Sequence, residues 1–124
     1  MKKKILIIED EKILGEMYRD KFIQAGFGVD LFEMGGEALK EISKEKPDLI
    51  LLDILLPKEN GISFLRKLRK KRGLALIPVV VFSNYDDQKT KEEALKLGVK
   101  EYLIKTAYTP KEIINKVKSY LKGQ

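Results

Sequence analysis

The chain has 124 residues, of which 44% are hydrophobic and 35% charged, a balance typical of one folded domain rather than a disordered chain. It contains neither cysteine nor histidine, which excludes disulfides, thiolate or imidazole metal ligands, and catalysis by a thiol or an imidazole. Its 25 basic residues exceed its 19 acidic ones, and the net charge of +6 permits weak attraction to polyanions.

Short apolar segments alternate along the chain with amphipathic ones. The segments at 5–8, 49–52, 79–82 and 102–104 are continuously apolar, which predicts parallel strands covered on both faces, whereas the less regular residues 28–32 predict an edge strand. Apolar residues at helical spacing predict helices around residues 14–22, 38–42, 62–68, 94–97 and 113–121. No apolar run approaches the roughly 18 residues of a membrane span, so we expect no membrane segment and a cytoplasmic protein.

The resulting order is a strand followed by a helix, repeated five times. Turn signals support it, since Asn60-Gly61 precedes the third helix and Thr109-Pro110 provides a cap and a first-turn proline for the last one. Right-handed crossovers between parallel strands place helices on both faces of the sheet. The predicted fold is therefore α/β, with three layers around a mostly parallel sheet.

Reactive side chains follow the predicted strands at the points where these end. Glu9 and Asp10 follow the first strand, Asp53 the third, Ser83 the fourth and Lys105 the fifth. In open α/β sheets, ligands bind at the carboxyl ends of the strands, where all five residues are expected to meet.

These charges constrain what the edge can bind. Two carboxylates about 5 Å apart, such as Asp10 and Asp53, repel by about 3 kcal/mol at an effective dielectric constant of 20. The cluster must keep a proton, recruit a cation, or pair with Lys105. Without histidine or cysteine, Mg²⁺ is the first candidate cation, and a Mg²⁺ pocket with a lysine and the Ser83 hydroxyl suits a phosphoryl group. A carboxylate is then the candidate nucleophile.

Competing nucleotide motifs are absent from the sequence. No G-x-G-x-x-G follows a strand and no G-x-x-x-x-G-K-[ST] occurs, so neither a dinucleotide site nor a P-loop is predicted.

Several segments together resemble a known family. They are Ile5–Glu11, Asp48–Asp53, Pro57 and Gly61, Val79–Ser83, and Tyr102–Lys105. In this order and spacing, the chain resembles the receiver domain of two-component response regulators, of the stand-alone chemotaxis-regulator type. The resemblance implies a doubly wound (βα)5 flavodoxin-like fold with strand order 2-1-3-4-5. It also implies that residues 1–124 form a single receiver domain with no output domain attached.

The resemblance further implies a role for each matching residue. Asp53 would accept a phosphoryl group from a phosphohistidine on a sensor histidine kinase or phosphotransfer protein. Asp10, Asp53 and the Leu55 carbonyl would ligate Mg²⁺, and Glu9 would act through a water. Ser83 and Lys105 would contact the phosphoryl oxygens, and Tyr102 would be the switch aromatic that turns inward. Such a protein would not be an enzyme beyond its own phosphotransfer and dephosphorylation.

Four residues depart from the family pattern or tune it. Thr106 replaces a proline that usually forms a cis bond; a cis bond before threonine costs roughly 2.5–4 kcal/mol, so a trans loop is expected and Lys105 could point elsewhere. Asn84 replaces a smaller alanine and could narrow access to Asp53. The bulky Leu55 and Tyr85 occupy positions that modulate phosphoryl lifetime, and they predict slow dephosphorylation.

The output of the chain is less determined by its sequence. The family usually signals through a face that here spans residues 87–121, from Asp87 to Leu121, which is rich in lysine and suits an acidic partner or a second copy in a homodimer. The basic run at residues 66–72 lacks interleaved aromatic residues, so nucleic-acid binding is not favoured. The alternative function is a pseudo-receiver, a scaffold that keeps the fold without being phosphorylated.

Overall fold

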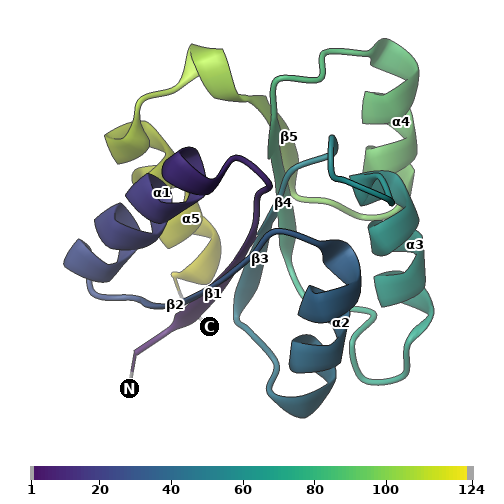
Figure 1. The fold of residues 1–124 in the computed structure, drawn as a ribbon, viewed down its shortest axis with the longest axis horizontal. Coiled ribbons are helices and arrows are strands. Elements are labelled where there is room, and N and C mark those ends of the chain that lie inside the picture. Colours follow the sequence, from purple (N-terminus) through teal and green to yellow (C-terminus); the bar gives the residue numbers. More distant parts are fainter. Residues whose placement is uncertain (1, 123–124) are drawn as a thin grey trace.

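A parallel sheet lies between two layers of helices in the structure, a computed structural model that describes residues 2–122 (Figure 1). The strands are β1 (Lys4–Ile8), β2 (Gly28–Phe32), β3 (Leu49–Leu52), β4 (Val79–Ser83) and β5 (Glu101–Ile104). The helices are α1 (Lys12–Gln24), α2 (Gly35–Lys44), α3 (Gly61–Lys70), α4 (Gln88–Lys96) and α5 (Pro110–Leu121), with a short 3₁₀ turn, η1 (Lys105–Ala107), after β5.

The strand order is β2-β1-β3-β4-β5 and every pairing is parallel, which confirms the predicted fold class and topology. Ile8 at the end of β1 lies in register with Phe32 on one side and Leu52 on the other. Ser83 at the end of β4 lies opposite Ile104 at the end of β5. The residues that follow these strands are therefore brought to one edge of the sheet.

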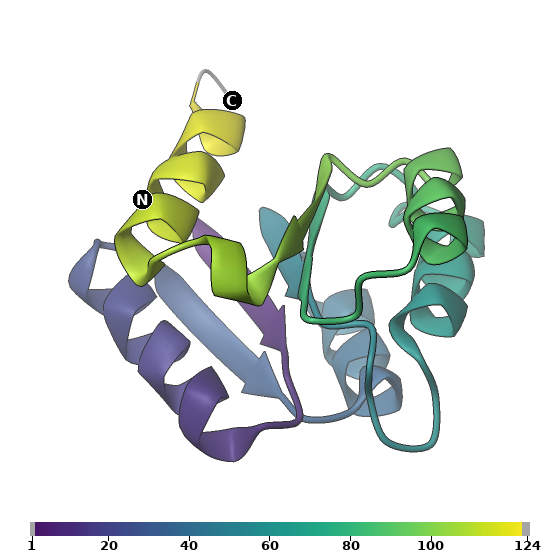
Figure 2. The same cartoon turned by 90° about the horizontal axis from the view of Figure 1, so that it is seen from above.

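Each face of the sheet has its own core. Side chains alternate between faces along a strand, so Ile5 and Ile7 pack with α1 and α5, whereas Leu6 and Ile8 pack with α2, α3 and α4. Figure 2 shows this separation, with α1 and α5 on one side of the strands and α2–α4 on the other. Because both faces are covered, the strands are continuously apolar rather than alternating.

The two outer strands differ from each other in how well the sequence predicted them. β2 is an edge strand with all its residues half-buried, as predicted. The prediction that residues 102–104 are buried on both faces was wrong, because β5 is the opposite edge and only Leu103 in it is buried. A three-residue apolar run carries no information about whether another strand lies beyond it.

Arg69, near the end of α3, donates hydrogen bonds to main-chain carbonyls of neighbouring elements. Its guanidinium donates to the carbonyls of Leu97 (2.7 Å) and Gly98 (3.3 Å) at the end of α4. It also donates to the carbonyls of Ala75 (3.0 Å) and Ile77 (2.8 Å) in the α3–β4 connection. These carbonyls lie just after α4 or in a connection, where no helix or strand provides them with a hydrogen-bond donor. Arg69 therefore satisfies acceptors that would otherwise need water.

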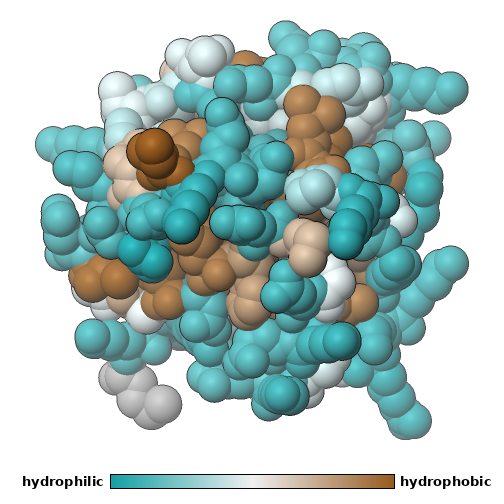
Figure 3. Space-filling model, in the orientation of Figure 1, coloured by the Kyte–Doolittle hydropathy of each residue, from teal (hydrophilic) through white to brown (hydrophobic). Residues whose placement is uncertain are grey.

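The surface is mostly hydrophilic in the view of Figure 3, with apolar atoms grouped over α1 and the adjacent part of the sheet. Ile13 in α1 is 86% exposed. Among the helices of residues 2–122, none combines the length and the hydropathy that crossing a bilayer requires.

The connection from β3 to α3 passes very close to its own helix. A Cβ atom on Gly61 would lie 2.5 Å from the carbonyl oxygen of Asp53 and 2.9 Å from the Cα of Ile54, which are both backbone atoms. The Gly61 N–H also donates to the Ile54 carbonyl at 2.7 Å. A glycine is therefore required here by space.

Replacing this glycine should cost stability. We expect Gly61→Ala to lower the free energy of unfolding by about 1–3 kcal/mol, the usual range for overpacking, because backbone atoms beside Asp53 have to move. The matched control is Gly36→Ala in α2, where a new Cβ has no neighbour within 4 Å and stability should stay equal or rise slightly. Urea unfolding followed by circular dichroism measures both, and an unchanged midpoint for Gly61→Ala would contradict the steric argument.

Candidate functional site

Three of the predicted site residues share one face of the sheet by simple alternation. Glu9 continues the series of Ile5 and Ile7, and Asp53 and Lys105 continue the corresponding series in β3 and β5, all on the side covered by α1 and α5. The N–H of Asp53 donates to the carbonyl of Ile8 at 3.0 Å, which extends the β1–β3 pairing to this position. The three side chains therefore converge.

Lys105 is the centre of this group. Its ammonium nitrogen lies 2.8 Å from Asp53 Oδ2 and 2.5 Å from Glu9 Oε1, and all three side chains are at most 7% exposed. Glu11 Oε2, which is largely exposed, lies 3.6 Å from the same nitrogen. Of the three outcomes considered from the sequence, pairing with Lys105 is therefore present in the structure.

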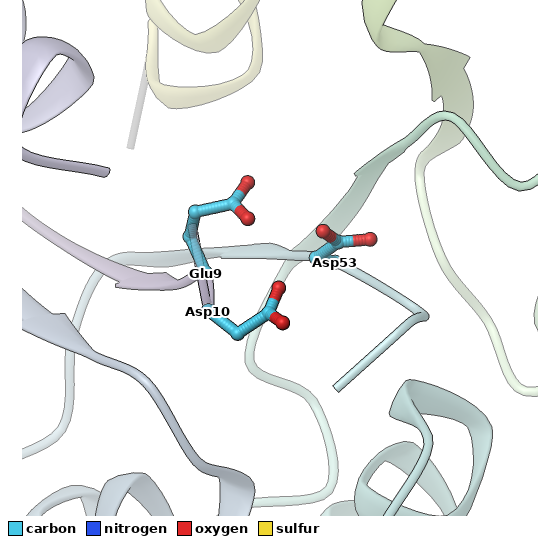
Figure 4. A group of neighbouring side chains, drawn as sticks. All are labelled: Glu9, Asp10 and Asp53. Carbon is cyan, nitrogen blue, oxygen red and sulfur yellow. The ribbon is translucent and has the colours of Figure 1, made fainter. Parts of the chain in front are cut away.

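Asp10 completes an acidic cluster from the solvent side. One carboxylate oxygen each from Glu9, Asp10 and Asp53 lies within 4.8 Å of the others, and Asp10 is exposed where the other two are buried. Figure 4 shows the three carboxylates gathered at the ends of β1 and β3. Three carboxylate oxygens at this separation form the hard, anionic donor set that a Mg²⁺-sized cation prefers, so the residues fit the predicted metal.

Burial and the ion pairs act in opposite directions on the pKa values of the cluster. Burial raises the pKa of Glu9 from 4.5 to about 7, against the opposing effect of Lys105 and of the Glu11 N–H. Burial disfavours the ammonium of Lys105, but the hydrogen bonds to Asp53 and Glu9 outweigh it and raise the pKa of Lys105. Lys105 is therefore a permanent cation here, and Glu9 is an acid that changes protonation near neutral pH.

Ser83 and Tyr102 do not belong to this group. They follow the alternation of the other face, where Val81 and Tyr102 pack toward α3 and α4. The fully buried Ser83 hydroxyl accepts the N–H of Tyr85 at 3.2 Å, and the Tyr102 hydroxyl donates to the carbonyl of Tyr85. Burial, with the nearby charge of Asp53, raises the pKa of Tyr102 to about 12, so it stays a donor.

Leu55 and Tyr85 line a surface pocket beside α3 and α4, just beyond the ends of β3 and β4. The N–H of Leu55 donates to Asp53 Oδ1 at 3.2 Å, while Leu55 is 52% exposed and Tyr85 is 39% exposed. Neither side chain is hydrogen-bonded to the carboxylate of Asp53. The predicted role of the Leu55 carbonyl as a metal ligand stays a prediction.

Two features of the site were missed from the sequence. Glu11 is a further carboxylate beside Lys105, which the run Glu9-Asp10-Glu11 could have signalled. The N–H of Thr106 donates to the side-chain oxygen of Asn84 at 3.3 Å, a contact between positions that local sequence patterns cannot relate. No cis peptide bond occurs among the described residues, so the bond before Thr106 is trans as predicted, and Lys105 nevertheless reaches Asp53.

The two basic surfaces are partly engaged within the chain. In the run at residues 66–72, Arg66 pairs with Glu93, Lys67 pairs with Glu59, and Arg69 binds carbonyls as described above. On the face at residues 87–121, Lys91 pairs with Asp86 and Lys116 with Glu101, in addition to the buried Lys105. The remaining lysines of this face are exposed: Lys89, Lys96, Lys100, Lys111 and Lys118.

Fold and site together define the class of CheY-like α/β domains. The family described as "Response regulator receiver domain" matches residues 5–118, and the chain belongs to that family.

Individual relatives agree with this assignment. The chain is 34% identical over 122 residues to the alkaline phosphatase synthesis transcriptional regulatory protein PhoP of Bacillus subtilis, covering 98% of this chain and 50% of that protein. It is 31% identical over 119 residues to the phosphate regulon transcriptional regulatory protein PhoB of Rhizobium meliloti, covering 96% of this chain and 52% of that protein. The chain thus spans about half the length of these curated relatives.

Solved structures show the same fold. A CheY-like receiver domain from Methanospirillum hungatei superposes with a TM-score of 0.90 at 26% identity, covering 98% of this chain and 94% of that one. The BeF3-activated receiver domain of Klebsiella pneumoniae RstA superposes with a TM-score of 0.84 at 29% identity, covering 96% and 98%.

The raised pKa of Glu9 predicts a pH-dependent stability of the metal-free protein. Between pH 4.5 and about 7 the unfolded chain loses the Glu9 proton while the folded protein keeps it, so this residue makes stability fall as pH rises. A tenfold change in proton affinity corresponds to about 1.4 kcal/mol, so the fall attributable to Glu9 is at most about 3 kcal/mol. Urea unfolding across this pH range measures it.

The variant Glu9→Gln should remove that decline and be more stable than the unsubstituted protein at pH 8. Its control is Glu11→Gln, which removes an exposed carboxylate beside the same ammonium and should leave the decline in place. Equal pH profiles for Glu9→Gln and the unsubstituted protein would show that Lys105 compensates the burial of Glu9 completely.

Proposed function

We propose that the chain is a phosphorylation-switched receiver module in which Asp53 accepts a phosphoryl group from the phosphohistidine of a sensor histidine kinase or phosphotransfer protein. The observation that carries this proposal is the buried contact of Lys105 with Asp53 and Glu9, at 2.8 and 2.5 Å. The Asp53 carboxylate is thereby oriented as a nucleophile at the carboxyl end of the sheet. The natural setting of such a module is the cytoplasm, and we treat residues 1–124 as one receiver domain.

The reaction needs little from the protein beyond charge and position. A bond forms from an Asp53 oxygen to phosphorus while the phosphorus–nitrogen bond of the phosphohistidine breaks, and the departing imidazole takes up a proton. Mg²⁺, when bound, supplies positive charge that offsets the phosphoryl oxygens. It would be held by the acidic cluster together with the main chain after Asp53: Glu9, Asp10, Asp53 and the Leu55 carbonyl.

Lys105 and Ser83 are proposed to bind the oxygens of the added phosphoryl group. A phosphoryl group adds about −1.5 to −2 charges at the end of β3. The Lys105 ammonium, already at Asp53, can bind a phosphoryl oxygen without crossing solvent. The Ser83 oxygen accepts the Tyr85 N–H, which leaves the hydroxyl proton for a second phosphoryl oxygen.

A chain of contacts links this event to the surface. Ser83 is bonded to the N–H of Tyr85, and the carbonyl of Tyr85 accepts from Tyr102. Movement of Ser83 toward a phosphoryl group would displace Tyr85 and release the Tyr102 hydroxyl, which allows the ring to turn inward. Asp87, which caps α4 through Thr90, lies two residues after Tyr85, so the position of α4 would change with it.

The changed surface is proposed to be the face at residues 87–121. Its exposed lysines favour a partner with an acidic surface, or a second copy of the chain that presents the acidic residues of its own α4 region. The curated relatives are named as transcriptional regulators. Direct binding of nucleic acid by these 124 residues is not part of the proposal, because Arg66, Lys67 and Arg69 are engaged within the chain.

The central prediction is stoichiometric phosphorylation at one residue. Incubation with Mg²⁺ and acetyl phosphate should add the mass of one phosphoryl group, because Asp53 is the carboxylate that Lys105 holds in place. Asp53→Asn should abolish the addition, whereas the matched control Asp20→Asn, on the exposed side of α1, should not. Intact-mass spectrometry measures all three proteins.

Failure of the unsubstituted protein to gain mass, under conditions where Mg²⁺ binding is measured, would contradict the proposal. The chain would then be the pseudo-receiver scaffold, which keeps the fold without the chemistry.

The side chains of Leu55 and Tyr85 predict a long-lived phosphoryl group. Leu55 is apolar and the bulky Tyr85 makes no side-chain hydrogen bond to Asp53, so neither positions a hydrolytic water there, and we expect loss of the phosphoryl group over minutes or longer. Leu55→Asn should shorten the lifetime at least about threefold, which requires less than 1 kcal/mol in the barrier. Leu76→Asn, at a 94% exposed position remote from the site, is the control. A half-life of seconds in the unsubstituted protein would disprove the argument.

A further inference from the structure

The two departures from the family pattern, Asn84 and Thr106, are bonded to each other. The N–H of Thr106 donates to Asn84 Oδ1 at 3.3 Å. The strand register explains how they meet, because Ser83 at the end of β4 lies opposite Ile104 at the end of β5. The connections that leave these two strands therefore begin side by side.

Threonine at position 106 requires a hydrogen-bond acceptor that proline at this position would not require. Proline has no N–H, whereas Thr106 brings a donor to the start of the 3₁₀ turn η1, where N–H groups have no acceptor within the turn. Asn84 supplies that acceptor from the neighbouring connection. An alanine at position 84 could not do so.

We propose that Asn84 is a positioning residue for Lys105: its side-chain oxygen holds the Thr106 N–H and thereby fixes the turn that aims the Lys105 ammonium at Asp53 and Glu9. Its effect on phosphotransfer rests on the function proposed above. Its effect on the placement of Lys105 does not.

The geometry explains why the turn needs this contact. Lys105 precedes Thr106 directly, and its side chain is buried between two carboxylates although its backbone lies just after the edge strand β5. The β4–β5 pairing holds the chain up to Ile104, and the Asn84–Thr106 bond holds it just beyond. Lys105 is thus fixed on both sides. Asn84 and Thr106 are exposed, so water competes for the bond and the effect of losing it is moderate.

This role and simple obstruction by the Asn84 side chain make opposite predictions. If Asn84 only narrowed access to Asp53, Asn84→Ala would open the pocket and speed phosphorylation. If Asn84 positions Lys105, the same variant slows it. Asn84→Leu separates the two further, because it keeps the bulk and removes the acceptor, whereas Asn84→Asp keeps both bulk and acceptor.

The experiment uses two readouts on the unsubstituted protein, the three Asn84 variants and the control Asn115→Ala, an exposed asparagine on α5. The first is the rate at which the Lys105 amine is acetylated by sulfosuccinimidyl acetate, followed by peptide mass spectrometry, with the ion-paired Lys4 as internal standard. The second is the rate constant of phosphorylation at saturating acetyl phosphate, together with the Mg²⁺ concentration that gives half the maximal rate.

We expect Asn84→Leu and Asn84→Ala to acetylate Lys105 about two- to tenfold faster and to phosphorylate about two- to tenfold slower, the range that one hydrogen bond spans. Lys4 labelling should not change, since it does not depend on the turn after β5. The half-saturating Mg²⁺ concentration should not rise, because a displaced Lys105 ammonium competes less for Asp53 and Glu9. Asn84→Asp should restore the burial of Lys105, and Asn115→Ala should match the unsubstituted protein.

Unchanged Lys105 labelling in Asn84→Leu, or faster phosphorylation of Asn84→Ala, would overturn the proposal. If the unsubstituted protein takes up no phosphoryl group, the proposed function fails, and the labelling of Lys105 alone decides whether Asn84 positions it.

Discussion

The buried ion pair of Lys105 with Asp53 and Glu9 is the constraint on which the rest of the site depends. Two carboxylates in a nearly dry position are unstable unless a cation joins them, and here that cation comes from the residue after the edge strand β5. Removing the lysine would leave buried negative charge without compensation, so the pair fixes the relative position of β1, β3 and β5. The Lys105 ammonium, which stabilises the two buried carboxylates, is also the cation that a phosphoryl group on Asp53 would need.

The alternation of side chains along the strands divides the site into two halves. Glu9, Asp53 and Lys105 lie on the side of α1 and α5, and they supply charge. Ser83 and Tyr102 lie on the side of α3 and α4, and their hydrogen bonds run through Tyr85. The residues proposed for phosphoryl transfer and those proposed for the switch therefore lie on opposite faces of one sheet. They meet only at the strand ends, where a group attached to Asp53 could be reached from both.

Much of this arrangement could be predicted because it is local. Continuous apolar runs indicated four strands, the strand ends indicated Glu9, Asp10, Asp53, Ser83 and Lys105, and the same period of two would have separated Ser83 from Glu9, Asp53 and Lys105. What could not be predicted depends on pairs distant in sequence. Nothing near residue 102 says that β5 is an edge, and nothing near Arg69 says that its guanidinium binds carbonyls of the α4 end rather than an external anion.

Asn84 and Thr106 show the same limit at the site itself. Taken singly, each looks like a loss: a bulkier residue at the pocket and a missing proline after Lys105. Together they form one contact, in which the donor that threonine introduces meets the acceptor that asparagine introduces. A rigid ring is replaced by a hydrogen bond to the neighbouring connection, and Lys105 still reaches Asp53 through a trans peptide. Because the new contact joins the connection after β4 to that after β5, the proposed movement of Ser83 toward a phosphoryl group would be transmitted to the turn that carries the lysine.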